Sequence, residues 1–315
     1  MRGWWRDLTD LVLPAECGGC GRARTVLCPE CRRALSGAVP RRVRPVPEPP
    51  GLPAVHAAAR YGDEVRAVLL AHKERGVLAL AGPLGVALAG AVRVGLEEAW
   101  TGAGGAGFAG ARGPVLLVPV PSARRAVRAR GHDPARRIAL AAAGELRRTG
   151  TPARVLAVLR QRRAVADQSG LGARRRLDNL AGALAVAPGA DRLLGSGQVV
   201  LVDDLMTTGA SLTEAARAVR AARTEAIVDR GERAESSAVR GTYGSVRTAV
   251  YPSVVWEGRE EQKSGEAADA TVREPEAPGM AGPGGGGAVV REDAREVICA
   301  AVVAASPDPF QINRN

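Results

Sequence analysis

Two adjacent carboxylates and a hydroxyl-rich loop make residues 199–212 the segment with the clearest chemical pattern. Four aliphatic residues run directly into Asp203 and Asp204. Apolar residues then repeat at helical spacing, at Leu212, Ala215, Ala216 and Val219. This order predicts a buried parallel strand over 199–202, acids just past its end, a tight loop over 207–211 and then a helix. Ligands of open α/β sheets bind at the carboxyl ends of such strands.

The loop after the two acids has the residue types that bind phosphate. Its hydroxyl donors and small residues are Thr207, Thr208, Gly209, Ala210 and Ser211. Small residues let the backbone approach an anion, and a helix start adds unpaired N–H groups and the positive end of the helix dipole. Ser211 and Glu214 also fit a capping box, which leaves the first residue of the helix open.

The paired acids add a second binding function to the phosphate loop. Asp203 and Asp204 can accept hydrogen bonds from vicinal sugar hydroxyls, directly or through a bound Mg²⁺. A phosphate on one side and a diol on the other describe a ribose 5-phosphate. The alternative is a buried strand that ends in helix-capping acids. A Walker-type nucleotide site is excluded, because the only glycine run, 284–287, is followed by Ala-Val-Val.

Four of the five cysteines form two Cys-x-x-Cys pairs near the N-terminus. They are Cys17, Cys20, Cys28 and Cys31. Each pair can direct two sulfurs at one metal, so the spacing predicts a closed, structural Zn²⁺ site with four thiolate ligands. A redox function is the alternative. Cys299 lies in an apolar run and is expected in the core.

Charge is unevenly distributed along the chain. The formal net charge is +11, and residues 111–180 contain sixteen arginines but only four acids. Such a density suits polyphosphate or nucleic acid. The alternative is a composition rich in Arg and Ala, with most of the arginines on solvated helix faces.

Neither a membrane span nor a signal peptide is expected from the sequence. No run of eighteen apolar residues occurs, and the first ten residues contain acids where a signal peptide needs an apolar stretch. These features predict a cytoplasmic protein.

The order of elements predicts an α/β fold with a parallel sheet and a small N-terminal zinc module built on four cysteines. Residues 1–36 would form a helix and the zinc knuckle, and the six prolines of 37–53 indicate a linker. The main domain would comprise residues 54–222 and 295–315. Residues 223–294 are rich in Gly, Ser and mixed charge, which predicts a low-order insertion.

Within the main domain, apolar periodicity locates the elements. Helices are expected over 65–73, 77–98, 134–148 and 211–222, and further buried strands over 115–122 and 297–305. An Arg-rich segment, 160–178, is expected to form a mobile loop.

Cysteine pairs, a Pro-rich linker and a late Asp-Asp motif together resemble the ComF family. The resemblance covers residues 4–222 and 296–315. Its further motifs are Tyr61–Arg66, His72–Gly76, Val118–Pro121, Arg130-Gly131, Gln168–Leu171 and Arg176–Gly182. The chain departs where the family commonly has Phe-Asn-Gln, since His132-Asp133-Pro134 stands there. Members are described as type I phosphoribosyltransferase-like and are associated with competence for DNA uptake.

The resemblance implies how the candidate residues would bind phosphoribosyl pyrophosphate (PRPP) with Mg²⁺. Asp203 and Asp204 would hold the ribose diol and stabilise developing positive charge, and the 207–211 loop would bind the 5-phosphate. The pyrophosphate would meet Pro119, Val120, Pro121 and Ser122, with Lys73, Arg130 and Arg176 as cationic partners. Arg174 and Arg175 would lie in or beside a closing loop. His132 is expected to be a solvated loop residue, with a general base as the alternative.

Two functions follow from this resemblance. The first is an enzyme that transfers the phosphoribosyl group to a nitrogen nucleophile. The second is a non-catalytic competence accessory that binds single-stranded DNA or a DNA-uptake helicase. Few aromatic residues lie in the basic segment, which weakens the second.

Overall fold

The computed structural model describes residues 16–102, 113–163, 165, 172–243 and 299–306. The chain divides into two compact units, one formed by Met1–Gly231 with Asp293–Asn315 and the other by Glu232–Glu292. In the second unit, the structure describes only the last part of one helix. The predicted N-terminal helix and the Gln168–Leu171 motif lie outside the described residues, as does most of the predicted insertion.

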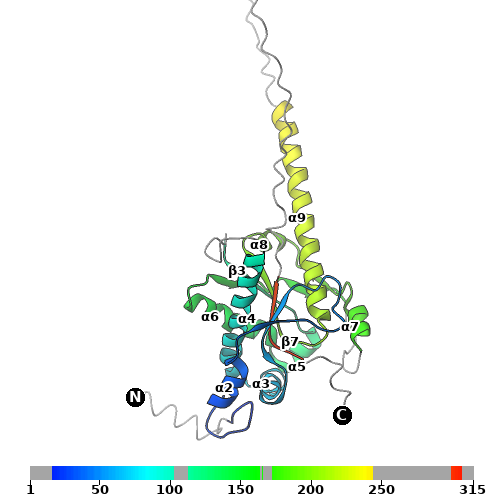
Figure 1. Cartoon of the computed structure of the whole chain (residues 1–315). Coiled ribbons are helices and arrows are strands. Elements are labelled where there is room, and N and C mark those ends of the chain that lie inside the picture. Colours follow the sequence, from blue (N-terminus) through cyan, green and yellow to red (C-terminus); the bar gives the residue numbers. More distant parts are fainter. Residues whose placement is uncertain (1–15, 103–112, 164, 166–171, 244–298, 307–315) are drawn as a thin grey trace, which may run out of the picture. The chain divides into compact units, whose positions relative to one another are not determined.

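A six-stranded sheet in the order β1-β2-β8-β7-β3-β4 organises the first unit (Figure 1). Its strands are β1 (Arg41–Val43), β2 (Val55–Arg60), β3 (Val115–Pro119), β4 (Ala153–Val155), β7 (Gln198–Met206) and β8 (Cys299–Ala305). All neighbours pair in parallel except β1 and β2. The long apolar runs of the three central strands suit a parallel sheet covered on both faces. The predicted α/β class is therefore confirmed.

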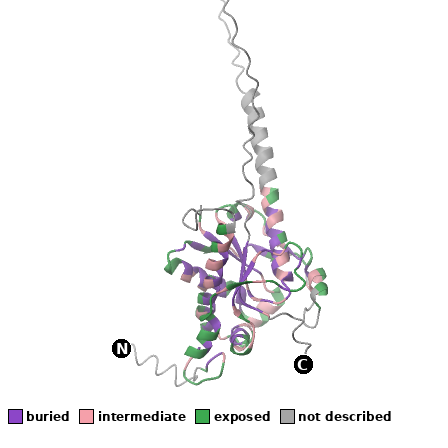
Figure 2. Ribbon diagram, viewed as in Figure 1, coloured by how far each residue is buried: buried purple, intermediate pink, exposed green. Residues whose placement is uncertain are grey.

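Two hydrophobic clusters cover the two faces of the sheet, and alternation along the strands assigns side chains to each. On β7, Val200 and Val202 enter the cluster under α4 (Ala81–Gly102) and α6 (Pro134–Arg148). Val199 and Leu201 enter the cluster under α9 (Ala210–Tyr243). Successive side chains of a strand point to opposite faces, so this division follows directly from the strand geometry. Figure 2 shows the buried sheet strands between these layers.

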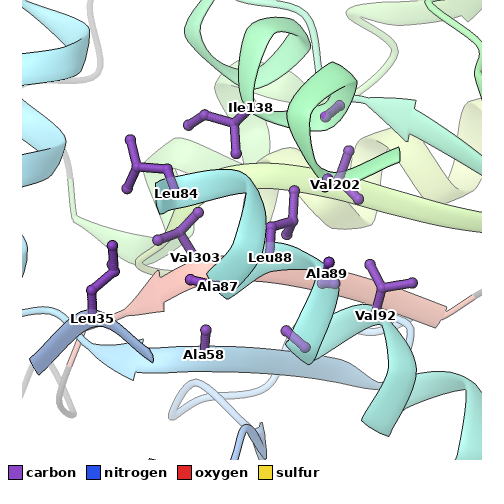
Figure 3. Packing of buried hydrophobic residues seen from close by; sticks show 14 of the residues in the cluster. Leu35, Ala58, Leu84, Ala87, Leu88, Ala89, Val92, Ile138, Val202 and Val303 are labelled. Atoms are coloured by element: carbon purple, nitrogen blue, oxygen red, sulfur yellow. The ribbon is translucent and has the colours of Figure 1, made fainter. Parts of the chain in front are cut away.

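The cysteine segment and α2 (Pro29–Ser36) share the main core. Leu35 of α2 is fully buried in the same cluster as Ala58, Leu84 and Val303, as Figure 3 shows. The cysteine loop packs on both α3 (Asp63–Lys73) and η1 (Leu78–Leu80). A Cβ on Gly18 would lie only 2.7 Å from a methyl carbon of Leu80. The N-terminal module and the sheet therefore form one continuous core.

The Pro-rich segment, expected to be a linker, is part of the sheet. Its β1 pairs antiparallel with β2, and Val43 and Leu52 pack against the α9-side cluster. At its far end, Arg220 of α9 donates a 2.8 Å hydrogen bond to the Gly51 carbonyl. Prolines lack backbone donors, which explains why only three residues of this segment pair as a strand.

A two-stranded hairpin and short helices lie beside the main sheet. Strands β5 (Leu159–Gln161) and β6 (Leu184–Val186) pair antiparallel, and α7 (Ala173–Leu180) lies between them in sequence. The remaining helices are α5 (Arg124–Arg130) and α8 (Asp191–Leu194). Glu214 of α9 anchors the hairpin by accepting a 2.9 Å hydrogen bond from the Leu184 amide.

Most expected elements are present, with several differences. The segment 160–178, expected to form a mobile loop, contains the end of β5 and most of α7, and the strand expected over 115–122 ends at Pro119. The helix 134–148 is found as predicted, whereas the strand predicted over 199–202 extends to Met206, and the helix predicted over 211–222 extends to Tyr243. Glu214 is bound to the hairpin and Arg217, so it does not form the predicted capping box.

Helix α4 is long and apolar enough to be compared with a membrane-crossing helix. The stretch Leu78–Thr101 has 24 residues and a mean hydropathy of 1.6, and half of it is buried. It packs against α6, β8 and β2. This packing explains its apolar composition, because a helix between a sheet and another helix is apolar on two sides.

We predict that Gly85→Ala destabilises the protein, because α4 and α6 meet at this residue. A Cβ there would lie 2.5 Å from the Ala141 Cβ and 2.8 Å from its backbone carbon. We expect a loss of about 1–3 kcal/mol in the free energy of unfolding. Gly144→Ala in α6, where a Cβ meets nothing within 4 Å, should instead gain about 0.5–1 kcal/mol. Denaturant unfolding measures both, and equal effects would contradict the close approach.

Candidate functional site

The chain reverses its direction across the sheet between β3 and β7. From β3 it passes through α6 to β4 on one side, and from β7 through α9 to β8 on the other. The two helices cover opposite faces, since α6 belongs to one core cluster and α9 to the other. The loops that follow β3 and β7 therefore diverge and open a crevice. This is the position at which open α/β sheets bind ligands.

The loop between β7 and α9 forms a small polar cavity at this crevice. The cavity has a volume of about 30 Å³ and is lined by Asp203 and the residues from Leu205 to Leu212. Gly209 adopts φ +77°, which favours glycine, and ends the loop before the first turn of α9. Within the described chain, the amides of Thr207, Thr208 and Gly209 donate to no protein acceptor. Together with the helix start, they can bind an anion.

The two acids lie within β7, which corrects the expectation that they follow it. Asp203 is paired with Val302 of β8, and the strand continues through Leu205. The Asp203 Oδ1 atom accepts a 2.8 Å hydrogen bond from the Asp204 amide. Strand β7 pairs with β8 as far as Met206. This pairing extends β7 beyond its apolar residues 199–202.

Lys73 neutralises one of the two carboxylates. Its Nζ atom lies 2.8 Å from the Asp204 Oδ2 atom, and the Asp204 side chain is 8% exposed. Burial opposes the charge of Lys73, but the Asp204 and Asp203 carboxylates outweigh it and raise the Lys73 pKa. Burial and the Asp204 charge also raise the pKa of Asp203 well above its usual value. Asp204 is thus held in an ion pair with Lys73, whereas Asp203 can bind a proton or a cation.

Two other predicted residues lie elsewhere than expected. Arg130 donates to the Glu74 Oε1 atom at 3.1 Å and to the Ala126 carbonyl. Its guanidinium therefore connects α5 to the end of α3. His132, expected to be solvated, is 8% exposed. It is enclosed because its ring packs beside His72, with ring centroids 5.5 Å apart.

The loop after β3 is held by backbone contacts. The Val120 amide donates to the Val202 carbonyl at 2.9 Å, which ties the loop to β7. The Ser122 amide donates to the Asp133 Oδ2 atom at 3.3 Å, and Asp133 also caps α6. A cavity of about 280 Å³ adjoins this loop, lined by Pro121, Ser122, Arg124, Val127, Arg128, Asp133, Leu159, Arg160 and Gln161. The loop thus lies between β7 and an arginine-lined cavity.

Arg176 connects α7 to the 207–211 loop. Its Nη1 atom donates a 3.3 Å hydrogen bond to the Thr207 hydroxyl, while its buried Nε atom has no partner among the described residues. Arg174 and Arg175 are exposed on the same helix. The structure therefore gathers the acids, the 207–211 loop, Lys73 and Arg176 at one crevice.

The Pro-rich segment packs against the 207–211 loop. A Cβ on Gly209 would lie 3.1 Å from both methyl carbons of Leu52 and 3.5 Å from the Pro45 ring. Neither this contact nor the role of Asp133 was predicted from the sequence. The Asp-Pro pair at 133–134 marks a helix start and was the available signal for Asp133.

The four N-terminal cysteines form a cluster that can hold a metal ion such as zinc. Their sulfurs all lie within 4.8 Å of one another, and Cys20 alone is exposed. Burial opposes ionisation of Cys17, but backbone amides, including that of Cys28 at 3.3 Å, lower its pKa to about 6. Burial raises the pKa of Cys31. A bound cation would favour the thiolate form of all four.

No protein-family model and no curated protein matches this chain.

We predict opposite effects on stability for the two acids. Asp203→Asn should raise the free energy of unfolding at pH 7, because it removes a carboxyl whose folded pKa is raised. Asp204→Asn should lower it by about 1–3 kcal/mol, because it leaves Lys73 without its partner.

The pH dependence gives a further check on Asp203. A carboxyl with a raised folded pKa favours folding while it is protonated, and this contribution is lost as the pH rises through the raised value. The gain from Asp203→Asn should therefore disappear as the pH falls towards the usual carboxyl value of 3.8. Urea unfolding at several pH values measures it, and a gain that persists in acid would contradict the assignment.

Proposed function

We propose that this chain binds PRPP with Mg²⁺ as a type I phosphoribosyltransferase-like protein of the ComF kind. The observation that carries the proposal is the crevice at the ends of β3 and β7, where an anion-binding loop adjoins two acids. A phosphate and a vicinal diol on neighbouring ligand atoms fit this combination. The resemblance of the sequence motifs to the ComF family supports the same ligand.

Each element of the crevice has a role in this proposal. The open amides of the 207–211 loop and the Arg176 guanidinium would bind the 5-phosphate. Asp203 and Asp204 would accept the ribose hydroxyls and stabilise positive charge that develops at the anomeric carbon. The loop Pro119–Ser122 and Lys73 would meet the pyrophosphate. Transfer to a nitrogen nucleophile would then need positioning and charge stabilisation, with no covalent enzyme intermediate.

Mg²⁺ fits the charge distribution of the crevice. Asp203 forms no ion pair within the described chain, whereas Asp204 is already paired with Lys73. Asp203 is therefore the residue that would hold the cation. Mg²⁺ would supply positive charge to the pyrophosphate as it leaves.

A second function is favoured by the arginines beside the crevice. Arg124, Arg128 and Arg160 are exposed and line the cavity of about 280 Å³. None of the three forms an ion pair with a described acid. Such a surface would suit a non-catalytic accessory in the cytoplasm that binds single-stranded DNA or a helicase partner.

We predict that Asp203→Asn weakens PRPP binding about tenfold or more, which corresponds to the loss of one charge-assisted interaction. Calorimetric titration with PRPP and Mg²⁺ measures it. The variant is expected to be more stable than the wild-type protein, so weaker binding would not reflect unfolding. Asp191→Asn on α8, which lines neither cavity, is the matched control.

Other outcomes separate the two functions. No binding by the wild-type protein would remove the PRPP proposal. Binding with release of pyrophosphate on addition of nucleobases would support the enzyme. Tight, salt-sensitive binding of single-stranded DNA without turnover would support the accessory protein.

We further propose that the cysteine cluster holds one structural Zn²⁺ through Cys17, Cys20, Cys28 and Cys31. Purified protein should contain about one zinc per chain, and Cys28→Ser should remove it. Because Cys28 belongs to the main core, the variant should also melt at a lower temperature. Cys299→Ala, a buried cysteine outside the cluster, should retain the metal. Elemental analysis and thermal melting check this, and a metal-free wild type with full stability would contradict it.

A further inference from the structure

The end of α3 is bound to the turn between α5 and α6 by two polar contacts. Arg130 contacts Glu74 through its guanidinium at 3.1 Å. The His132 Nε2 atom lies 3.1 Å from the His72 carbonyl oxygen, and its Nδ1 atom lies 3.1 Å from the Arg130 carbonyl oxygen. These contacts bracket Lys73, because they involve the residue before it and the residue after it.

The partners of His132 define the form of its ring. Both ring nitrogens face carbonyl oxygens, which can only accept hydrogen bonds. A neutral imidazole has one N–H, so only the imidazolium form can donate to both. His72 differs, because its Nδ1 atom faces the Val77 carbonyl at 3.4 Å and its Nε2 atom has no partner in the described part of the chain. Burial lowers the His72 pKa, which keeps this second ring neutral beside His132.

We propose that His132 is a positioning residue that holds Lys73 against Asp204 by binding the carbonyls of His72 and Arg130 as an imidazolium. The peptide bond that carries the His72 carbonyl also carries the Lys73 nitrogen. Fixing this carbonyl fixes the backbone from which the lysine reaches Asp204. The importance of this for PRPP binding rests on the proposed function, whereas the positioning itself does not.

Charged groups surround the histidine pair and Lys73. They are Glu74, which follows the last residue of α3, Arg130 of α5, Arg137 of α6, and Asp203 and Asp204 of β7. The two acids favour the positive charge of Lys73, and Arg130 opposes it.

The sequence allows a direct test, because Lys73 and Lys263 are its only lysines. Limited acetylation of the full-length protein, followed by mass spectrometry, gives the labelling of Lys73 relative to Lys263. An ion-paired amine is protonated and reacts slowly. We expect slow labelling of Lys73 in the wild-type protein and a severalfold increase in Asp204→Asn. His132→Ala should give an increase of similar size.

Three further variants make the test specific. His132→Gln keeps a side-chain N–H donor, so it should label more slowly than His132→Ala, and it replaces that variant if alanine prevents folding. The double variant His132→Ala with Asp204→Asn should label no faster than Asp204→Asn alone, because both changes release the same amine. His56→Ala removes another buried histidine, whose ring contacts Glu98, and should leave the labelling of Lys73 unchanged.

Two results would overturn the proposal. The first is wild-type labelling of Lys73 in folded His132→Ala and His132→Gln, while Asp204→Asn labels faster. The second is a neutral His132 ring in the ¹H–¹⁵N correlation spectrum of the three histidines at neutral pH. Both measurements need no PRPP, so a failure of PRPP binding would leave them unaffected. If the wild-type protein binds PRPP, His132→Ala should weaken that binding while His56→Ala does not.

Discussion

Two neighbouring carboxylates in the central strand of a buried sheet cannot both be ionised without a compensating charge. At this position the compensation comes from Lys73, which lies 2.8 Å from Asp204. Lys73 is the last residue of α3, so the position of this helix decides whether the amine reaches Asp204. Helix α3 in turn is held by the cysteine loop along its side and by the α5–α6 turn at its end. A large part of the first unit therefore supports one ion pair.

The core is built mainly from small residues, and this determines how closely its layers approach. Only 3% of the chain is aromatic, and alanines fill much of both clusters. Small side chains bury little apolar area each, so stability depends on many close backbone contacts. The crossing of α4 and α6 at Gly85 is one such contact. A larger residue at this crossing would separate layers that have few long side chains to fill the resulting gap.

Features that depend on the local residue pattern were predicted from the sequence. Features that depend on contacts with distant chain segments were not. The helix 134–148 follows from apolar periodicity. The cysteine cluster follows from ligand spacing. In contrast, the extension of β7 through Asp204 depends on pairing with β8, almost a hundred residues later in the chain. The partner of Arg130 and the burial of His132 depend on α3. The family resemblance implied a pyrophosphate-binding arginine at 130, but its guanidinium donates to Glu74 instead.

The Pro-rich segment shows how a boundary drawn by composition can mislead. Its prolines suggest a spacer between two modules, yet Leu52 and Pro45 lie over Gly209, and β1 completes one edge of the sheet. A fragment that begins at residue 54 would lose residues that pack on the 207–211 loop and would expose the edge of β2. The segment also follows α2 in the chain and reaches Gly209, so it connects the cysteine cluster to the crevice. The two sites therefore cannot be separated at a domain boundary within residues 37–53.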